Sequence, residues 1–356
     1  MNTIYLHPMV ARLFATLNTN VTTQSGSGAS LTAEMKTFYS NNLIDLAEPE
    51  LVHDQFGQKH PIPKNGGKTI EFRKYSSLPK ATTALTEGVT PNGQSLNVTT
   101  LTATVAQYGG YVTLSDVLLL TAIDNNLMQA SKLLASQAGR TLDTITREVL
   151  NGGTNVYYCA SGVTDKANLV GGSATASDNN TLTVDDIRRA VRKLKTMNTP
   201  KINGGYVAII HPDVSYDLMS DPEWQRPHEY VDTDNIYAGE IGRIAGCRFV
   251  ETTEAKVWKK AAKDKSSGTA VAGDGSTQGW DVYSTLVLGA DAYGVTEVTG
   301  GGLQMIIKQL GSAGTEDPLD QRATAGWKAI KVAERLVEEY MIRVMSVSSF
   351  NDASAN

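Results

Sequence analysis

The spacing of hydrophobic residues changes along the chain, and each change predicts a different kind of element. Apolar residues recur every three or four positions in 31–48, 127–150 and 183–197, a spacing that is typical of amphipathic helices. Threonine and β-branched residues alternate with other residues in 69–75 and 96–105, which predicts two strands. Helices and strands in this order indicate an α+β fold.

Capping residues mark the ends of the first and last of these helices. Ser30 is placed to cap the helix at 31–48, and Pro49 follows its end. The segment Thr183-Val-Asp-Asp186 begins the helix that runs through Met197, and Pro200 closes it.

The middle helix is the longest. Ser115 and Asp116 cap a helical stretch that the polar run 124–126 interrupts and that ends at the Asn-Gly-Gly sequence 151–153. At 1.5 Å per residue, the part from 127 to 150 alone makes a helix about 36 Å long. We therefore expect it to form the spine of a domain.

The two alternating strands flank a segment rich in turn residues, 76–95. This segment contains Leu-Pro at 78–79 and Gly-Val-Thr-Pro-Asn-Gly at 88–93, so the region predicts a long hairpin with an extended loop. A two-stranded ribbon is marginally stable in water by itself, and we expect this one to lie on another surface. The sequence offers no partner for the loop within the chain.

Gly67-Lys68-Thr69, just before the hairpin, matches the end of a phosphate-binding P-loop. The motif also requires a glycine at position 62, where this chain has Ile62 between two prolines. The prolines lack two of the N–H donors, and the residues after Thr69 predict a strand instead of the required helix. We interpret 65–68 as a turn that leads into the strand, with glycines supplying positive φ angles.

After the third helix, the pattern of apolar residues predicts mostly strands. Short strands are predicted at 206–210, 244–250 and 284–288, and long ones at 327–332 and 340–347.

Three other regions have different patterns. Residues 1–30 are rich in Thr, Asn, Ser and Gly and predict an arm that is not ordered alone. His211-Pro-Asp213 begins a short helix toward Leu218, and we interpret Asp213 as its cap. The region 256–279 is rich in Lys, Ala, Gly and Ser and predicts an exposed loop.

Composition narrows the possible classes of protein. The chain has 356 residues, a formal net charge of -5 and a pI near 5.6, which argues against a dedicated nucleic-acid binder and favours protein partners. Cys159 and Cys247 lie far apart, so a disulfide framework is not expected and a reducing compartment fits. Residues 1–17 lack the features of a signal peptide, and no apolar run approaches the roughly 18 residues of a membrane span. We expect a soluble protein that is not secreted.

No group of residues predicts a catalytic, cofactor-binding or metal site, and we expect no enzyme. The five histidines lack metal-ligand spacing, and the common nucleophile, zinc and dinucleotide motifs are absent. His211 and Asp213 are better interpreted as a turn than as an acid–base pair. The acidic run 221–234 lacks the EF-hand spacing, so a solvated loop is favoured over a cation site. The basic residues of 183–197 are interpreted as a solvated helix face, with a nucleic-acid surface as the alternative.

The elements follow a characteristic order: an arm, a long hairpin, a spine helix, a mixed α/β region, and late strands that return to the spine. Several separated segments have characteristic sequences, in the same order: Glu48–Gly57, Asn65–Phe72, Leu85–Pro91, Gln107–Asp116, Ile210–Asp213 and Asp317–Trp327. In both respects the chain resembles the major capsid proteins of tailed bacteriophages, which have the Hong Kong 97-type fold. Within that group it is similar to the major capsid family named after coliphage N-four. The resemblance covers nearly the whole chain from residue 32.

The resemblance implies a division into five regions. These are an N-terminal arm and helix (1–61), an extended β-hairpin loop that overlies a neighbouring subunit (62–113), a peripheral domain with the spine helix (114–199), an axial domain around capsomer centres (200–305), and strands that return to the peripheral domain (306–356). Some relatives have a cleaved scaffolding segment or covalent cross-links between subunits, and nothing in this sequence selects either.

The implied function is that of a structural major capsid protein. It self-assembles as hexamers and pentamers into an icosahedral shell around the double-stranded DNA of a tailed bacteriophage, and the arm and hairpin let one body contact several neighbours. Further implied partners are scaffold, portal and decoration proteins and nonspecifically contacted DNA, with no membrane. The implied location is the virion capsid, assembled in the host cytoplasm.

Two alternatives remain open. An encapsulin-like bacterial nanocompartment shell shares the fold but encloses enzymes, and particle diameter and cargo distinguish it. An α/β enzyme or a carbohydrate-binding module is the second alternative, which the absence of converging polar residues disfavours.

Overall fold

The computed structural model describes residues 19–20, 52–90, 92–121, 126–175, 178–224, 240–275, 277–297, 301–312 and 317–352. The predicted helix at 31–48 lies outside these residues, as does the arm except for the short strand β1 (Thr19–Asn20). Within the described ranges, every helix is too short or too polar to span a membrane. The chain forms two compact units: unit 1 comprises 1–51, 107–142 and 301–330, and unit 2 comprises 52–106, 143–300 and 331–356.

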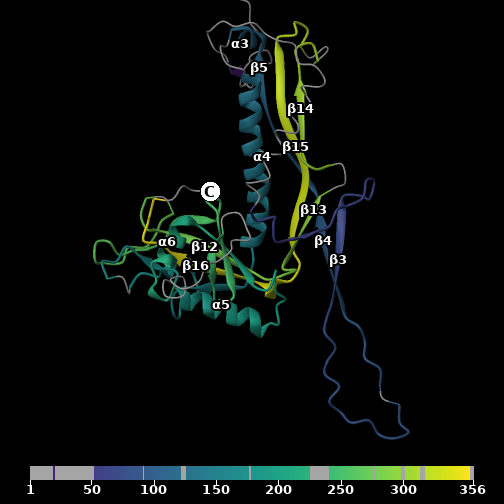
Figure 1. Cartoon of the computed structure of the whole chain (residues 1–356), viewed down its shortest axis with the longest axis vertical. Coiled ribbons are helices and arrows are strands. Elements are labelled where there is room, and N and C mark those ends of the chain that lie inside the picture. The colour runs from purple at the N-terminus through teal and green to yellow at the C-terminus, as the bar shows by residue number, and fades with distance from the viewer. Residues whose placement is uncertain are drawn as a thin grey trace, which may run out of the picture. The chain divides into compact units, whose positions relative to one another are not determined.

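Two long strands and one shorter strand lie side by side in unit 1 (Figure 1). The central strand is β15 (Arg322–Arg335), which pairs with β5 (Ala106–Ser115) and, antiparallel, with β14 (Gln304–Lys308). β1 pairs in parallel with the other edge of β5. The predicted strand at 327–332 is therefore confirmed, and the observed strand β15 extends beyond it at both ends.

Two helices follow β5. They are α3 (Asp116–Thr121) and α4 (Asn126–Asn151), which continues into unit 2. Ser115 caps α3, because its Oγ accepts a hydrogen bond from the N–H of Leu118 at 3.2 Å. In unit 1, α4 contacts the sheet through Gln137, whose Oε1 accepts from the indole of Trp327 at 3.0 Å. The predicted spine helix and its end are confirmed, and its predicted interruption falls largely on residues outside the described ranges.

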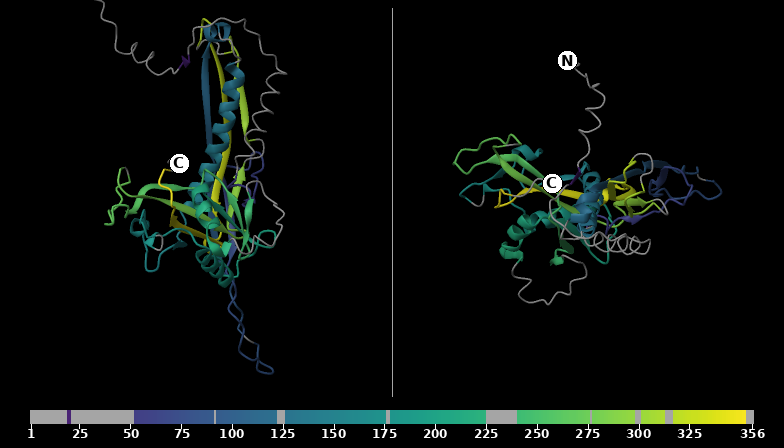
Figure 2. Two further views of the ribbon diagram at one scale, coloured as in Figure 1. Left: turned by 60° about the vertical axis from the view of Figure 1, so that its left-hand side comes forward. Right: turned by 90° about the horizontal axis from the view of Figure 1, so that it is seen from above.

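Unit 2 is built around an eight-stranded sheet in which most neighbours are distant in sequence (Figures 1 and 2). The strand order is β6-β16-β12-β8-β10-β9, and β11 pairs with both β12 and β7. The strands are β6 (Val156–Tyr158), β7 (Val170–Gly171), β8 (Tyr206–Ile210), β9 (Glu240–Ile244), β10 (Cys247–Glu251), β11 (Val257–Asp264), β12 (Trp280–Leu288) and β16 (Met341–Val347). The strands predicted at 206–210, 284–288 and 340–347 are confirmed.

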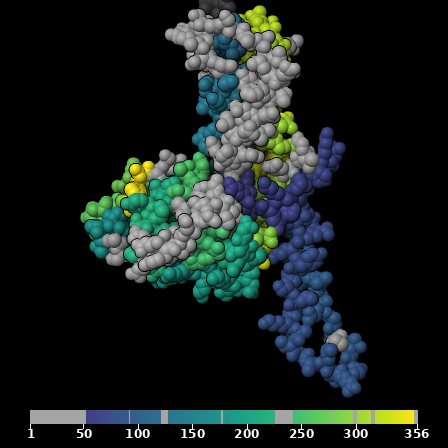
Figure 3. All heavy atoms as spheres, viewed as in Figure 1, coloured from purple at the N-terminus to yellow at the C-terminus, as the bar shows by residue number. Residues whose placement is uncertain are grey.

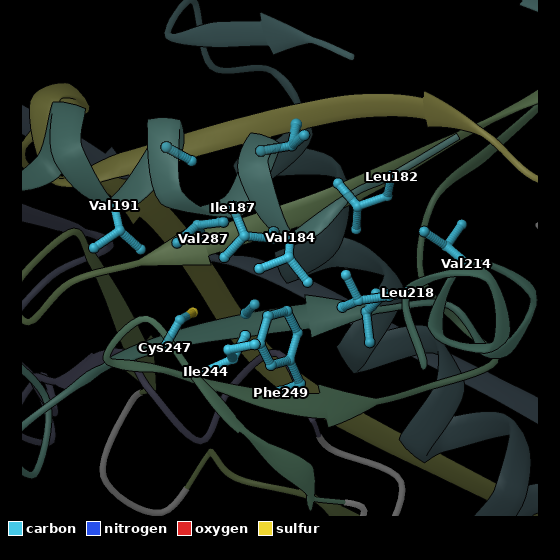
Figure 4. Close-up of a cluster of buried hydrophobic side chains, with 14 of the residues drawn as sticks. Leu182, Val184, Ile187, Val191, Val214, Leu218, Ile244, Cys247, Phe249 and Val287 are labelled. Atoms are coloured by element: carbon cyan, nitrogen blue, oxygen red, sulfur yellow. The ribbon is translucent and has the colours of Figure 1, made fainter. Parts of the chain in front are cut away.

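Helix α5 (Val184–Thr196) covers one face of this sheet. Its apolar residues Val184, Ile187 and Val191 point toward Cys247 and Phe249 of β10 (Figure 4). Burying one side chain of this kind contributes about 1.5–3 kcal/mol, so the apolar stripe holds the helix in place. The shorter helices are α6 (Pro212–Met219), η2 (Lys166–Asn168) and η5 (Glu338–Tyr340).

Helix α5 and strand β16 share one core with β8 and β12. The apolar stripe of α5 is buried by strands that follow it in the chain, which its own periodicity cannot reveal.

Two predictions between 244 and 279 are corrected. The segment 244–250 is not one strand, because Ala245 and Gly246 have φ angles of 53° and 83° and form a tight turn between β9 and β10. The predicted loop at 256–279 begins with a strand, β11, which pairs antiparallel with β12. Its lysines hide the strand pattern, and Lys259 is held by an ion pair with Asp281 at 3.1 Å.

The predicted hairpin is confirmed, with a shorter range. β3 (Thr69–Tyr75) and β4 (Val98–Thr104) pair antiparallel along their whole length. The ribbon ends at Thr104, and the next strand, β5, pairs with β15 instead. Just before the ribbon, β2 (Gln58–Lys59) pairs with β13 (Tyr293–Glu297), which in turn pairs with the last residues of β15.

Candidate assembly site: the hairpin and its root

The β3–β4 ribbon has one attached face and one free face. Phe72 lies on the attached face, where its ring meets that of His60 edge to face with centroids 5.3 Å apart. The opposite face carries Glu71, Arg73 and Thr102, all exposed. Because successive side chains point to opposite faces of a strand, one face of the ribbon is attached at its base and the other face is open to solvent.

Beyond the base, the hairpin is entirely exposed. Every described residue from Arg73 to Thr100 is exposed (Figure 3). Six of them are large apolar side chains, with exposed fractions of 77% for Leu85, 66% for Leu96, 63% for Val89, 61% for Tyr75, 50% for Leu78 and 47% for Val98. Isolated apolar side chains are common on surfaces, but a concentration of them in one projecting loop marks an interaction site.

A tight turn forms the loop tip, which we define as Leu85–Val89. The N–H of Val89 donates to the carbonyl of Thr86 at 3.2 Å, and Gly88 has a φ of 75°. Positive φ at this position is required in a type II turn, which explains the glycine. The turn places Glu87 between two exposed apolar residues, Leu85 and Val89.

The hairpin root, residues 52–60, is held by buried polar groups. The N–H of His53 donates to Oδ1 of Asp143 at 2.8 Å, and its Nδ1 lies 2.6 Å from Oδ2 of the same carboxylate. The hydroxyl of Tyr293 donates to the carbonyl of His53. Burial raises the pKa of the Tyr293 hydroxyl well above its usual range, so it stays a donor.

Asp54 is the second anchor of the root. Its Oδ1 accepts from the hydroxyl of Thr146 at 2.6 Å, and its Oδ2 pairs with Nζ of Lys331, whose side chain is 1% exposed. A buried ion pair adds little net stability, but removing one partner leaves an uncompensated charge and costs several kcal/mol, on the order of 3–5. These contacts fix the root of the otherwise exposed hairpin to α4, β13 and β15.

The turn at 65–68 lacks the geometry of a phosphate cradle. The N–H of Gly66 donates to the carbonyl of Pro63 at 2.9 Å, so it is already used within the turn. Ile62 is buried, and β3 follows directly at Thr69. Asn65 and Gly67 have φ angles of 68° and 88°, so positive φ occurs here at one glycine and, unlike our expectation, at an asparagine.

His211 and Asp213 have local structural partners. Nδ1 of His211 accepts from the N–H of Asp213 at 3.2 Å, so His211 and not Asp213 caps α6, which corrects the sequence interpretation. Asp213 accepts from the hydroxyl of Tyr283 at 2.6 Å. Burial lowers the pKa of His211, and the carboxylates of Asp213 and Glu251 oppose that shift.

The other candidate groups do not converge either. Among the described residues, no three His, Cys, Asp or Glu side chains come together as metal ligands. Arg188 pairs with Glu223, and Arg189 pairs with Asp185 at 2.7 Å, as expected for a solvated helix face. Cys159 and Cys247 are buried free thiols, and burial raises the pKa of both. Most of the acidic run 221–234 lies outside the described residues.

Sequence reasoning found the exposed loop and missed the root. Asp54 and Lys331 lie 277 positions apart in the chain, and nothing local to these residues, to His53 or to Asp143 indicates that they meet. The available signal is the presence of charged residues within the apolar stripes of α4 and β15, where Asp143 and Lys331 occupy buried positions among apolar neighbours.

Comparison with known proteins places this geometry in context. A family model described as phage capsid protein matches residues 22–310. The fold is similar to the capsid of cyanophage Pam1 (14% identity, 98% of this chain and 100% of that chain, TM-score 0.60). It is also similar to the capsid of Ralstonia phage GP4 (15% identity, 85% of this chain and 90% of that chain, TM-score 0.59). A third similar structure is the capsid of cyanophage P-SCSP1u (14% identity, 94% of this chain and 93% of that chain, TM-score 0.56). No curated protein matches the sequence.

Proposed function

Because the chain belongs to the phage capsid protein family, we propose that its copies associate as hexamers and pentamers into an icosahedral shell around double-stranded DNA. It is a structural, non-enzymatic major capsid protein with the Hong Kong 97-type fold, and a component of the virion capsid that associates with itself. The encapsulin-like alternative is not favoured. Assembly in the host cytoplasm, with scaffold, portal and decoration proteins, belongs to the same proposal.

The observation that carries this proposal is the contrast between the hairpin and its root. The root is held by buried polar contacts, whereas the hairpin beyond it exposes six large apolar side chains. An exposed apolar segment on a firmly attached base is suited to contact a neighbouring copy. A specific contact buries about 800 Å² per partner, of which such a loop supplies a substantial part.

Regional roles are part of the same proposal, and the division into units supports them. We propose that the eight-stranded body of unit 2 forms the axial part of each capsomer, and that β5, β14, β15 and α4 form the peripheral part. This assignment moves α5 and β16 to the axial part, in line with their shared core. We propose that DNA is contacted nonspecifically and without tight binding, because a net charge of -5 does not favour neutralisation of phosphates.

Shortening the loop tests the proposal. Residues 76–95 are replaced by an Asn-Gly turn, and parent and shortened chains are compared by thermal melting, sedimentation and negative-stain microscopy. The parent is expected to form capsomers or closed particles. The shortened chain is expected to melt at nearly the same temperature, because the removed residues are exposed, but to remain as monomers or small capsomers.

Two results contradict the proposal. A parent chain that remains monomeric at all concentrations and salts, with no particles on expression, rules out the shell. A shortened chain that assembles as well as the parent shows that the loop is not an intersubunit arm.

A further inference from the structure

Asparagine is followed by glycine at four places in the chain: Asn65-Gly66, Asn92-Gly93, Asn151-Gly152 and Asn203-Gly204. This dipeptide is chemically labile, because the backbone nitrogen of the glycine can attack the side-chain amide of the asparagine. Glycine has no Cβ that would shield this nitrogen, and its backbone adopts conformations that other residues avoid. The four pairs are alike in sequence, so a difference in their reactivity must come from the fold.

The pair Asn151-Gly152 is buried at the end of α4. Asn151 is 6% exposed, its Nδ2 donates to the carbonyl of Arg147 at 2.9 Å, and its Oδ1 accepts from the hydroxyl of Ser284 at 2.6 Å. The N–H of Gly152 donates to the carbonyl of Glu148 at 3.0 Å. Attack of the Gly152 nitrogen would break these hydrogen bonds inside the protein, which leaves buried polar groups without partners. The fold therefore protects this pair.

Two further pairs lie in tight turns. The N–H of Gly66 donates to the carbonyl of Pro63 at 2.9 Å, and Asn65 has a φ angle of 68°. Asn203 and Gly204 have φ angles of 47° and 81°, and two backbone hydrogen bonds of 2.8 and 3.0 Å close the turn around them. Both pairs are exposed, but ring closure requires rotation of the backbone at the asparagine, which a closed turn resists.

The pair Asn92-Gly93 is open. Both residues are exposed, belong to no helix or strand and form no hydrogen bond with another described residue. Apart from its chain neighbours, no atom lies within 4 Å of a Cβ built on Gly93. The last hydrogen bond of the ribbon joins the N–H of Ser76 to the carbonyl of Asn97 at 3.0 Å, so the pair lies beyond the ladder. Its backbone is therefore free to rotate.

We propose that Asn92 is a self-modification site, at which the free subunit converts asparagine to aspartate or isoaspartate. The backbone nitrogen of Gly93 loses its proton and attacks Cγ of Asn92, so that the N–Cγ bond forms, the Cγ–Nδ2 bond breaks and ammonia leaves. Water then opens the cyclic imide at either carbonyl. One product is aspartate, and the other is isoaspartate, in which the main chain runs through the side-chain carbon. Each consumes one water molecule and adds one negative charge.

The added charge changes the character of the loop. Residues 76–97 contain one lysine, Lys80, and one glutamate, Glu87, so their formal charge falls from zero to -1. Val89 and Leu96 lie on either side of Asn92 in the sequence and are 63% and 66% exposed. A carboxylate costs more to remove from water than an amide, so the modified residue opposes burial of these apolar groups against a neighbouring copy. This consequence rests on the proposed function, whereas the chemistry at Asn92 does not.

Mass spectrometry tests the site. Dissociated subunits of the full chain are incubated in mildly alkaline buffer, and conversion is measured by peptide mapping at all four pairs, of which three are internal controls. Conversion at Asn92 is expected to be at least about tenfold faster than at the other three, because each of those must first open. In denaturant the four rates should become similar, since the fold no longer protects any pair.

Gly93→Ala tests the role of the attacking nitrogen. The added methyl group shields this nitrogen and restricts the backbone, so conversion at Asn92 should slow about tenfold. The melting temperature should stay the same, because the site of the new methyl group is open. Unchanged conversion in this variant would contradict attack by the Gly93 nitrogen.

Asn92→Asp imitates one product and tests the effect on assembly. It is expected to raise the concentration needed for particle formation about tenfold. Asn65→Asp makes the same change of charge at an exposed residue outside the loop and is expected to have little effect.

The outcomes separate this inference from the proposed function. Conversion at Asn92 that is no faster than at the other pairs in the folded subunit overturns the site. The same order of rates in denaturant would assign the difference to local sequence and also overturns the inference. If Asn92→Asp assembles as well as the parent, the effect on assembly is wrong and the shell remains. A parent chain that forms no particles overturns the function and the effect on assembly, whereas the conversion is decided separately on dissociated subunits.

Discussion

The Nδ1 atom of His53 lies 2.6 Å from Oδ2 of Asp143, and both side chains are fully buried. The same carboxylate accepts the backbone N–H of His53 at 2.8 Å, so it holds both the main chain and the side chain at the start of the hairpin root. Nε2 of His53 is also buried and has no hydrogen-bond partner within the described part of the chain. The orientation of the root therefore depends on Asp143.

Replacement of Asp143 should destabilise the subunit strongly. We expect Asp143→Ala to lower the free energy of unfolding by roughly 3 kcal/mol, because it leaves two buried donors without an acceptor. Asp143→Asn should cost less, since its amide oxygen still accepts one bond. Urea unfolding of dissociated subunits, followed by circular dichroism, measures both.

Asp185→Ala is the control for this prediction. Asp185 is 58% exposed and pairs with Arg189 on the surface of α5, so its loss should change the free energy of unfolding by less than about 1 kcal/mol. Equal effects at Asp143 and Asp185 would contradict the anchoring role of the buried contact.

Protonation of His211 should destabilise the fold in mild acid. Burial lowers its pKa below the ordinary value of 6.5, against the opposing effect of Asp213 and Glu251. The unfolded chain then binds more protons than the folded one between these two values. The stabilising contribution is fully present above about pH 6.5 and is lost as the pH falls toward the lowered folded pKa.

His211→Asn tests this pH dependence. An asparagine oxygen also caps a helix but does not titrate, so α6 should keep its cap. The free energy of unfolding, measured at a series of pH values from about 7.5 to 5.5, should fall less steeply in the variant than in the parent. Identical slopes would show that His211 does not contribute.

Gly171→Ala should strain the packing of β7 against Trp280 of β12 in the eight-stranded sheet. A Cβ at Gly171 would lie 2.2 Å from Cδ1 of Trp280, and that indole cannot move freely because it donates to the carbonyl of Ser348 at 2.7 Å. We expect a loss of about 1–3 kcal/mol in the free energy of unfolding. Gly93→Ala, where no atom lies within 4 Å, should be nearly neutral, and a loss of the same size there would refute the steric explanation.

Thr183 should contribute measurably through its cap. Its Oγ1 accepts from the N–H of Asp186 at 3.3 Å, and Asp186 accepts from the N–H of Thr183 at 3.2 Å. Thr183→Ala is expected to cost about 1 kcal/mol, and Thr183→Ser, which keeps the hydroxyl, should cost much less. Chemical denaturation of the two variants distinguishes a capping role from loss of the methyl group, for which both would be equally damaging.

Local elements were readable from the sequence wherever a pattern and its capping residues agreed. α5 begins after the predicted Thr183, α4 ends at the predicted Asn151, and the β3–β4 ribbon follows the alternation of its residues. Each of these features depends on groups within a few positions of one another, so short-range spacing carries the information. The exposure of the loop was readable for the same reason, because its polar, turn-rich composition cannot form a core.

Only the tertiary structure decided which element covers which face and which polar groups meet inside. Periodicity shows that α5 has an apolar stripe, but the packing of that stripe against Cys247 and Phe249 depends on strands that come later in the chain. Likewise, nothing local to Asp54 indicates that Lys331, 277 residues away, lies beside it. A buried charge is stable only where another segment brings its partner, and that partner is selected by the folded chain as a whole.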